Sequence, residues 1–202
     1  MNTWYNIKNI AEFDSPALVI YSERVKRNIL LLKGMIDDVQ RLRPHVKTHK
    51  TKEASLLLME AGISKFKCAT IAEAEMLASV QAPDVLLAYQ PVGPKVQRFI
   101  SLIKTYPHTK FSCLVDDFAA AQFLSEQAIA NNIKVSVFID LNIGMNRTGI
   151  DSGPKALELY KQCSLLQGIM PIGLHAYDGH INDADFTIRK GRCDEAFKDA
   201  PS

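Results

Sequence analysis

Short runs rich in β-branched and aromatic residues alternate along this chain with longer segments whose apolar residues recur at helical spacing. Ser22 is a residue type typical of an N-cap and stands before the first such segment. The apolar residues of that segment are Val25, Ile29, Leu32 and Ile36. The pattern predicts strands over 16–21, 41–47, 65–69, 85–89, 110–115, 134–141 and 171–177. It predicts helices over 22–38, 50–61, 71–79, 94–106, 117–131, 153–164 and 183–198.

The order of these elements gives six βα units after the leading strand, which predicts an α/β fold with a parallel sheet. A doubly wound sheet that binds a dinucleotide usually carries a glycine-rich loop near its start, and this sequence has none there. We therefore expect a TIM-type (β/α)8 barrel, which needs eight strands. Because the pattern supplies fewer, we expect residues 1–202 to form an incomplete barrel from a longer protein, with unpaired edges that favour association.

Composition narrows the class of protein further. The 202 residues are 47% hydrophobic, which suits one sizeable core, and the net charge of +2 offers no basic field for nucleic acid. No run approaches the ~18 apolar residues of a membrane span, and the N-terminus lacks the apolar run of a signal peptide. Four scattered cysteines without a Cys-x-x-Cys pair indicate reduced thiols, buried at Cys68 and Cys113, and hence a cytoplasmic protein.

Chemistry is expected at the carboxyl ends of the strands, where TIM barrels place their active sites. The segment 41–47 ends in a group of basic and imidazole side chains, and strand alternation puts Arg43, His45 and Lys47 on one face. In a parallel sheet, normally covered on both faces, such groups cost several kcal/mol unless they are partnered. Other titratable strand ends are Asp116, Asp117, Asp140, His175 and His180.

Alternation along the last two predicted strands points further side chains into the barrel. Val135, Val137, Ile139 and Leu141 are expected to meet the helices, as are Ile172, Leu174 and Ala176. That leaves His175 and Tyr177 on the interior side, with Lys47.

A lysine in a partly desolvated pocket has a lowered pKa and acts as a nucleophile or base, commonly through a Schiff base. Tyr177 is suited to stacking on a heteroaromatic ring, and Arg147 to bonding a phenolate or phosphate oxygen. From the residues alone, an aldehyde cofactor, a cofactor-free Schiff base and ordinary polarity at a barrel mouth all stay open.

Four segments together resemble one family. They are 14–19 (DSPALV), 43–50 (RPHVKTHK), 140–149 (D-x-N-x-G-x-x-R-x-G) and 173–180 (GLHAYDGH). They resemble, in order and over nearly the whole chain, the D-threonine aldolase and D-serine dehydratase family, which are pyridoxal phosphate enzymes of the alanine-racemase barrel type. The sequence departs from many relatives at Asn142, where they have an acid.

The resemblance implies roles for several residues. Lys47 would hold pyridoxal phosphate as a Schiff base and take the α-proton of the substrate, Arg147 would contact the phenolic oxygen of the cofactor, and Tyr177 would lie against its ring. His45 and His180 are expected among the cofactor contacts; these two, His49 and Thr51 receive no separate catalytic roles. Asp117, Asp183 and Asp185 suit helix starts, and Lys50 and Lys52 a solvated first turn.

The function implied is that of a lyase acting on small D-β-hydroxy amino acids, either an aldolase or a dehydratase. An amino-acid racemase, a non-catalytic pyridoxal phosphate-binding protein and a truncated, inactive product are the alternatives. The family continues past residue 202 into the last barrel strands and a β-rich domain that carries a pair of metal ligands. A divalent metal (zinc or manganese) is therefore expected only in the full-length protein, with no ligand in this chain. Relatives also suggest a homodimer.

Overall fold

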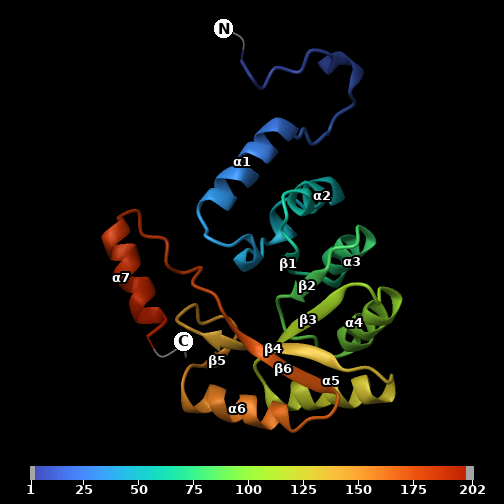
Figure 1. The fold of residues 1–202 in the computed structure, drawn as a ribbon, viewed down its shortest axis with the longest axis vertical. Coiled ribbons are helices and arrows are strands. Elements are labelled where there is room, and N and C mark those ends of the chain that lie inside the picture. The colour runs from blue at the N-terminus through green and yellow to red at the C-terminus, as the bar shows by residue number, and fades with distance from the viewer. Residues whose placement is uncertain (1–2, 199–202) are drawn as a thin grey trace.

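The computed structural model describes residues 3–198 (Figure 1). Its α-helices are α1 (Ser22–Gly34), α2 (Lys52–Glu60), α3 (Ile71–Ser79), α4 (Pro94–Thr105), α5 (Phe118–Ala130), α6 (Pro154–Ser164) and α7 (Phe186–Ala196). Its strands are β1 (Lys65–Cys68), β2 (Asp84–Leu87), β3 (Lys110–Val115), β4 (Val135–Asn142), β5 (Ile150–Asp151) and β6 (Ile169–Ala176). Short 3₁₀ helices are η1 (Ile10–Glu12), η2 (Val39–Arg41) and η3 (Val46–Thr48).

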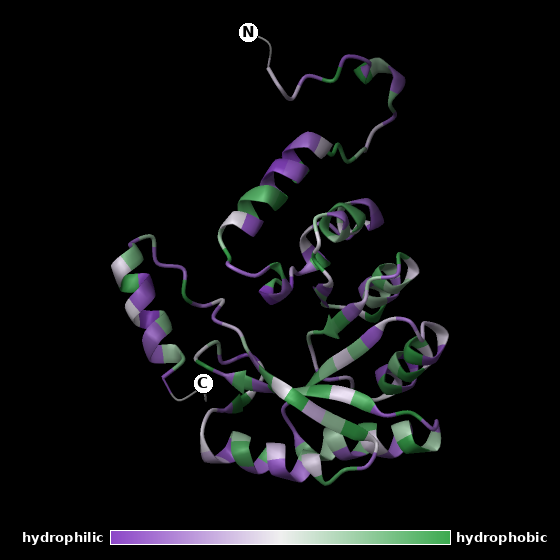
Figure 2. Ribbon diagram, viewed as in Figure 1, coloured by the Kyte–Doolittle hydropathy of each residue, from purple (hydrophilic) through white to green (hydrophobic). Residues whose placement is uncertain are grey.

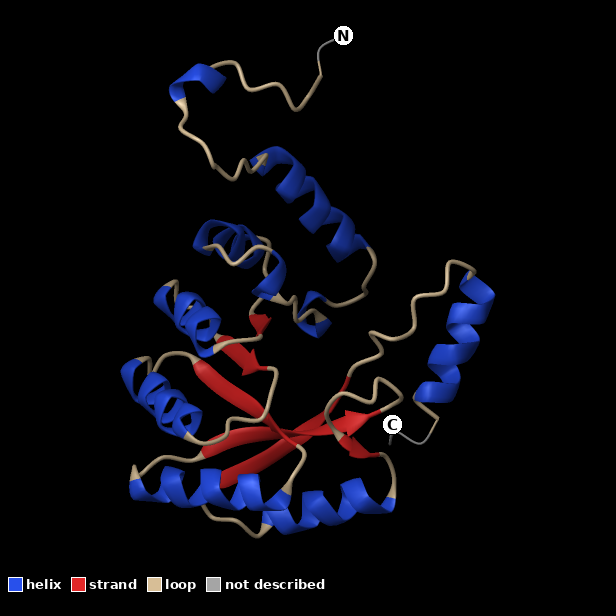
Figure 3. Cartoon of the chain, turned by 180° about the vertical axis from the view of Figure 1, so that it is seen from behind, coloured by secondary structure: helices blue, strands red, loops and turns tan. Residues whose placement is uncertain are grey.

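The strands form one parallel sheet that curves as part of a barrel wall. The order runs β1-β2-β3-β4, with β6 on the other side of β4, and the short β5 pairs with the last two residues of β4. Figure 3 shows the helices α3 to α6 lying along the outer side of the sheet, whereas α7 stands apart from it. The predicted α/β class and the parallel sheet of an incomplete barrel are confirmed.

Helices α2 to α7 begin where the sequence provides an acceptor or a proline. Thr51, Thr70, Asp117 and Asp185 each accept a hydrogen bond from the N–H three residues further on. This confirms Asp117 and Asp185 as helix starts, because each satisfies one of the free N–H groups of the first turn. The expectation for Ser22 is wrong, since Tyr21 occupies the cap position of α1 and Ser22 is its first helical residue.

The core lies between the outer side of the sheet and helices α2 to α6. Val135, Val137, Ile139 and Leu141 of β4 are all buried, as the alternation predicts. Cys68 and Cys113 are completely buried reduced thiols, and burial raises the pKa of both. In Figure 2 the strands are mostly green and white, whereas α7 is largely purple and pale.

Two predicted strands are absent. The segment 41–47 begins at the last residue of η2 and enters η3, with a single parallel bridge from His45 to Lys67. The chain leaves the sheet there because the His45 side chain accepts the N–H of Lys47 and starts the 3₁₀ turn. The segment 16–21 has no strand partner, and Leu18 is 80% exposed.

The outer face of β6 also differs from the sequence prediction. Ile172 and Leu174 are 40% and 36% exposed, although both were expected to meet helices. A register shift in the β4–β6 ladder leaves Ile172 without a partner on β4. In residues 3–198, β6 pairs only with β4, so its other edge has no strand or following helix to complete the cover. No helix of this described part is both long and apolar enough to cross a bilayer.

Candidate functional site

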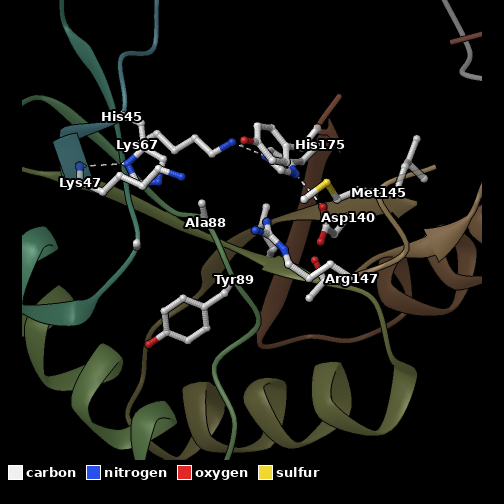
Figure 4. Close-up of a pocket in the computed structure, with 14 residues that line it drawn as sticks. His45, Lys47, Lys67, Ala88, Tyr89, Asp140, Met145, Arg147 and His175 are labelled. Atoms are coloured by element: carbon white, nitrogen blue, oxygen red, sulfur yellow. Dashed lines mark hydrogen bonds and ion pairs between the residues drawn. The ribbon is translucent and has the colours of Figure 1, made fainter. Parts of the chain in front are cut away.

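A cavity of ≈ 260 Å³ lies at the carboxyl ends of the strands (Figure 4). Its walls come from the segment before and within η3, from β1 to β4, from the loop after β4, and from β6. The polar side chains that line it are His45, Lys47, Lys67, Tyr89, Asp140, Arg147, Thr148, His175 and Tyr177. The structure therefore brings into one cavity four of the residues expected to contact the cofactor, His45, Lys47, Arg147 and Tyr177, together with the strand-end residues Asp140 and His175.

Lys47 enters the cavity from a fixed turn. His45 Nδ1 accepts the Lys47 N–H at 3.2 Å, and the intervening Val46 is completely buried. Arg43 is predicted to share a strand face with His45 and Lys47. In the structure it instead pairs with Asp84 at the start of β2 (2.5 Å) and donates to the Phe66 carbonyl. The prediction for Arg43 is wrong because only a single bridge of strand geometry joins this segment to β1.

Three cationic side chains surround the ring of Tyr177. The distances to the ring centroid are 5.9 Å from Lys47 Nζ, 5.3 Å from Lys67 Nζ and 5.5 Å from Arg147 Cζ. The electron-rich face of an aromatic ring attracts cations at such distances. Gly179 leaves room for the ring, since a Cβ there would lie 2.3 Å from it. The Tyr177 ring can occupy this position only because residue 179 has no side chain.

The loop that carries Arg147 is held by amide and carboxylate side chains. Asn142 Oδ1 accepts the N–H groups of Gly144 and Asn146, while its Nδ2 donates to Asn146 Oδ1. Asp116 Oδ2 accepts the Gly149 N–H at 2.8 Å. An amide at 142 can donate and accept at once, which an ionised acid cannot do. The departure from the family pattern at Asn142 therefore has a structural use in this loop.

Three polar side chains that line the cavity form a partly buried chain of hydrogen bonds. Lys67 Nζ lies 2.6 Å from His175 Nε2, and His175 Nδ1 lies 2.6 Å from Asp140 Oδ1. The side chains of His175 and Asp140 are only 13% and 7% exposed. Sequence reasoning missed Lys67, although alternation with the apolar Phe66 and Cys68 within one strand was a signal that it faces the interior.

The electrostatics of the cavity favour an anionic ligand. Three basic side chains, Lys47, Lys67 and Arg147, line it against one acidic side chain, Asp140. Burial, with Lys47 and Lys67 nearby, lowers the pKa of His45 to about 4, so its imidazole is neutral at pH 7. Burial also lowers the pKa of Lys67, the lysine that shows the shift sequence reasoning expected of a pocket lysine.

The remaining candidates lie outside this cavity. His180 contacts the loop at Gly144, where a Cβ would stand 2.7 Å from His180 Nε2, and it does not line the cavity. His49 accepts the Thr51 N–H and lines a separate groove with Leu18, while Thr51 caps α2. The residues 3–198 contain no group of three or more His, Cys, Asp or Glu side chains that could hold a metal ion.

Residues 20–200 match the model of the alanine racemase N-terminal domain. The chain belongs to this family. Curated relatives of this chain include the D-threonine aldolase of an Arthrobacter species, which is 26% identical over 174 residues. They also include the D-threo-3-hydroxyaspartate dehydratase of a Delftia species, 29% identical over 161 residues.

These matches cover 85% and 79% of this chain but only 45% and 42% of the relatives. The chain therefore spans about half the length of the curated relatives it matches. The crystal structure of the D-threonine aldolase from Filomicrobium marinum superimposes with a TM-score of 0.85 at 29% identity. That match covers 94% of this chain and 51% of the aldolase.

The family is dependent on pyridoxal phosphate, and the residues of the cavity fit that cofactor in kind. Lys47 offers an amine for its aldehyde, Arg147 a guanidinium for an anionic oxygen, and Tyr177 a ring beside which a pyridine can pack. The excess of basic side chains suits a phosphorylated ligand. The volume lies just below the roughly 300–1,000 Å³ of pockets for drug-sized ligands, which suits one substituted ring.

Proposed function

We propose that this chain is the pyridoxal phosphate-binding barrel portion, over residues 1–202, of a lyase acting on D-β-hydroxy amino acids. The observation that carries the proposal is the meeting of Lys47, Arg147 and Tyr177 in one positively charged cavity at the strand ends. The named activities of the relatives, D-threonine aldolase and D-threo-3-hydroxyaspartate dehydratase, supply the substrate class. Both names describe reactions of amino acids that carry a β-hydroxyl group.

When bound, pyridoxal phosphate supplies an electron sink for negative charge that develops on the substrate. We assign Lys47 Nζ two tasks: it would hold the cofactor through the aldehyde carbon and, once displaced there by the amino group of the substrate, it would accept the α-proton of the D-amino acid in the dehydratase reaction. Arg147 donates hydrogen bonds to the phenolic oxygen, and Tyr177 packs against the pyridine ring. Neutral His45 holds the turn that presents Lys47, through the hydrogen bond from the Lys47 N–H.

Two products follow from the same bound substrate. Loss of the α-proton and of the β-hydroxyl as water, followed by hydrolysis of the resulting imine, would give an oxo acid and ammonia. Removal of the β-hydroxyl proton with cleavage between the α- and β-carbons, followed by protonation of the α-carbon, would give glycine and an aldehyde. In the longer protein we propose a divalent metal, zinc or manganese, that polarises the β-hydroxyl as a Lewis acid. A cytoplasmic location, small-molecule D-amino acid substrates and a homodimer belong to the same proposal.

A trapping experiment tests the role of Lys47. The intact protein mixed with pyridoxal phosphate should turn yellow, and borohydride should fix the label on Lys47, as read by peptide mass spectrometry. Lys47→Ala should abolish both colour and turnover. Lys50→Ala is the matched control, because Lys50 is 67% exposed and does not line the cavity. A label on Lys67, or a Lys47→Ala protein that keeps its colour, would overturn the assignment.

Substrate assays then separate the lyase from its rivals. The intact protein should convert D-threonine or D-serine to an aldehyde with glycine, or to an oxo acid with ammonia, and a chelator should lower the rate. Interconversion of the D- and L-forms without either cleavage would instead identify a racemase, an activity named among the relatives. Cofactor binding without turnover of any of these substrates would identify a non-catalytic binding protein.

A further inference from the structure

Lys67 bridges two strands that are not neighbours in the sheet. In the strand order, β2, β3 and β4 separate β1, which carries Lys67, from β6, which carries His175. The 2.6 Å contact between Lys67 Nζ and His175 Nε2 therefore passes across the barrel interior (Figure 4). Asp140 and His175 are register partners on β4 and β6, so the pairing of these two strands fixes the contact between their side chains.

The hydrogen-bonded side chains of Lys67, His175 and Asp140 can hold one proton in two arrangements. An ionised Asp140 can only accept, so His175 Nδ1 carries a hydrogen toward it. His175 Nε2 then accepts a hydrogen from the Lys67 ammonium group, or it carries a second hydrogen and donates to a neutral Lys67 amine. Both arrangements use the same heavy-atom positions. The charge can therefore sit on Lys67, or on the His175 imidazolium next to the Asp140 carboxylate.

The surroundings of Lys67 bias this choice. The charged and titratable groups that face it are Asp140 from β4, His175 and Tyr177 from β6 and its end, Arg147 from the loop after β4, and His45, Lys47 and Arg43 from the segment that leads into η3. Burial lowers the pKa of Lys67, Asp140 raises it, and Lys47, Arg147 and Arg43 lower it. Lys67 thus loses its proton more readily than an exposed lysine.

We propose that Lys67 is the titrating cation of this cavity, a positioning residue whose charge state, shared with His175 and Asp140, sets the affinity for an anionic ligand. Protonated Lys67 adds a third cation beside Lys47 and Arg147 and strengthens binding. Deprotonation weakens binding. This inference rests on the proposed function only for the identity of the anion, a phosphorylated pyridine.

The first test measures the titration of Lys67 directly. In the intact apoprotein with ¹³C-labelled lysine, the Lys67 resonance is assigned by its loss in Lys67→Arg. It should titrate at a lower pH than the other lysines. Asp140→Asn should move its titration to still lower pH, since the variant removes the negative charge that favours the ammonium form. If Lys67 titrated at the same pH as the exposed lysines, the proposal would be overturned. This comparison is made within the wild-type protein, so it does not depend on whether a variant folds.

The second test measures anion affinity without the aldehyde. Calorimetry with 4′-deoxypyridoxine 5′-phosphate should show at least about tenfold weaker binding to Lys67→Met below the Lys67 titration, since one charged hydrogen bond is worth more than a factor of ten. The ratio of wild-type to Lys67→Met affinity should fall as the pH rises through that titration. Lys67→Arg should keep the affinity and move the loss to higher pH.

Lys65→Met is the matched control, because Lys65 lies two residues earlier on β1 and does not line the cavity. Its affinity and pH profile should equal those of the wild type. Equal affinity and pH dependence in Lys67→Met and wild type would overturn the proposal. Because the ligand cannot form a Schiff base, failure of Lys47 labelling would refute the proposed function and leave this result standing.

Discussion

Apolar residues are buried in the middle of the molecule but exposed at its two ends. In β3 every residue after Lys110 is buried, and the helices on either side of it contribute to the same core. At the ends, Leu18 and Ile172 are exposed, and α7 has no buried residue. The difference follows the pairing: β3 has a strand on each edge, whereas β6 is paired on one edge only and the segment 16–21 has no strand partner. The ends carry the pattern of a barrel wall without the neighbours that would cover it.

The largest expected effect separates core from edge. Phe99 in α4 is completely buried and packs edge-on against Phe111. Phe99→Ala should lower the free energy of unfolding by about 3–5 kcal/mol, from lost burial and the cavity left behind. Leu18→Ala, at an 80% exposed position, should change it by less than about 0.5 kcal/mol. Urea unfolding measures both, and equal losses would contradict the division into two regions.

A pH-dependent effect is expected next, at the junction between the N-terminal segment and the sheet. The folded-state pKa of His45 is about 4, below its usual 6.5, so the unfolded chain binds the proton more readily. Stability should therefore fall as the pH drops from about 6.5 to about 4. His45→Asn should remove part of that fall in urea unfolding midpoints. His108→Asn, at an exposed loop position, is the control and should retain the wild-type dependence.

Two aspartate caps with the same hydrogen-bond length provide a smaller and sharper comparison. Asp117 and Asp185 each accept an N–H at 2.9 Å at the start of α5 and α7. Asp117→Ala should cost about 1 kcal/mol in global stability, because α5 contributes to the core. Asp185→Ala should speed amide exchange within α7 while leaving the global unfolding midpoint unchanged. A shared global loss would show that α7 is part of the cooperative core.

The smallest effect on stability concerns the open edge. Ile172→Lys places a charge on β6 and should reduce self-association, measured by light scattering, because charges on edge strands oppose strand pairing between molecules. The free energy of unfolding should stay within about 0.5 kcal/mol. Leu157→Lys, at a 55% exposed position on α6, changes hydrophobicity equally away from any sheet edge. It should leave self-association as it is in the wild type.

Sequence reasoning succeeded where local pattern and neighbours agree. The helix 71–79 and the strand 110–115 have the predicted bounds, and β4 buries the face that alternation selects. It failed for 41–47, where one side-chain hydrogen bond from His45 diverts the chain into a 3₁₀ turn. It also missed β5, a two-residue strand that is too short to leave a periodic signal.

The site divides in the same way. Strand-end logic and the family resemblance were enough to select Lys47, Arg147, Tyr177 and His45, which the fold brings into one cavity. The same logic included His180, which instead lies against the loop at Gly144, because its position depends on how the chain turns after β6. The position of a residue at a strand end predicts where it lies along the barrel axis, but it does not predict the direction of its side chain.

By itself, the sequence determined the alternation of strands and helices, the parallel barrel class and the lysine segment, because periodicity and motif spacing are local properties of the chain. Only the tertiary structure decided that Lys67 meets His175, 108 positions away, and through it Asp140. The physical reason is curvature. Bending the sheet brings the interior faces of β1 and β6 together, and no local pattern encodes which side chains then touch.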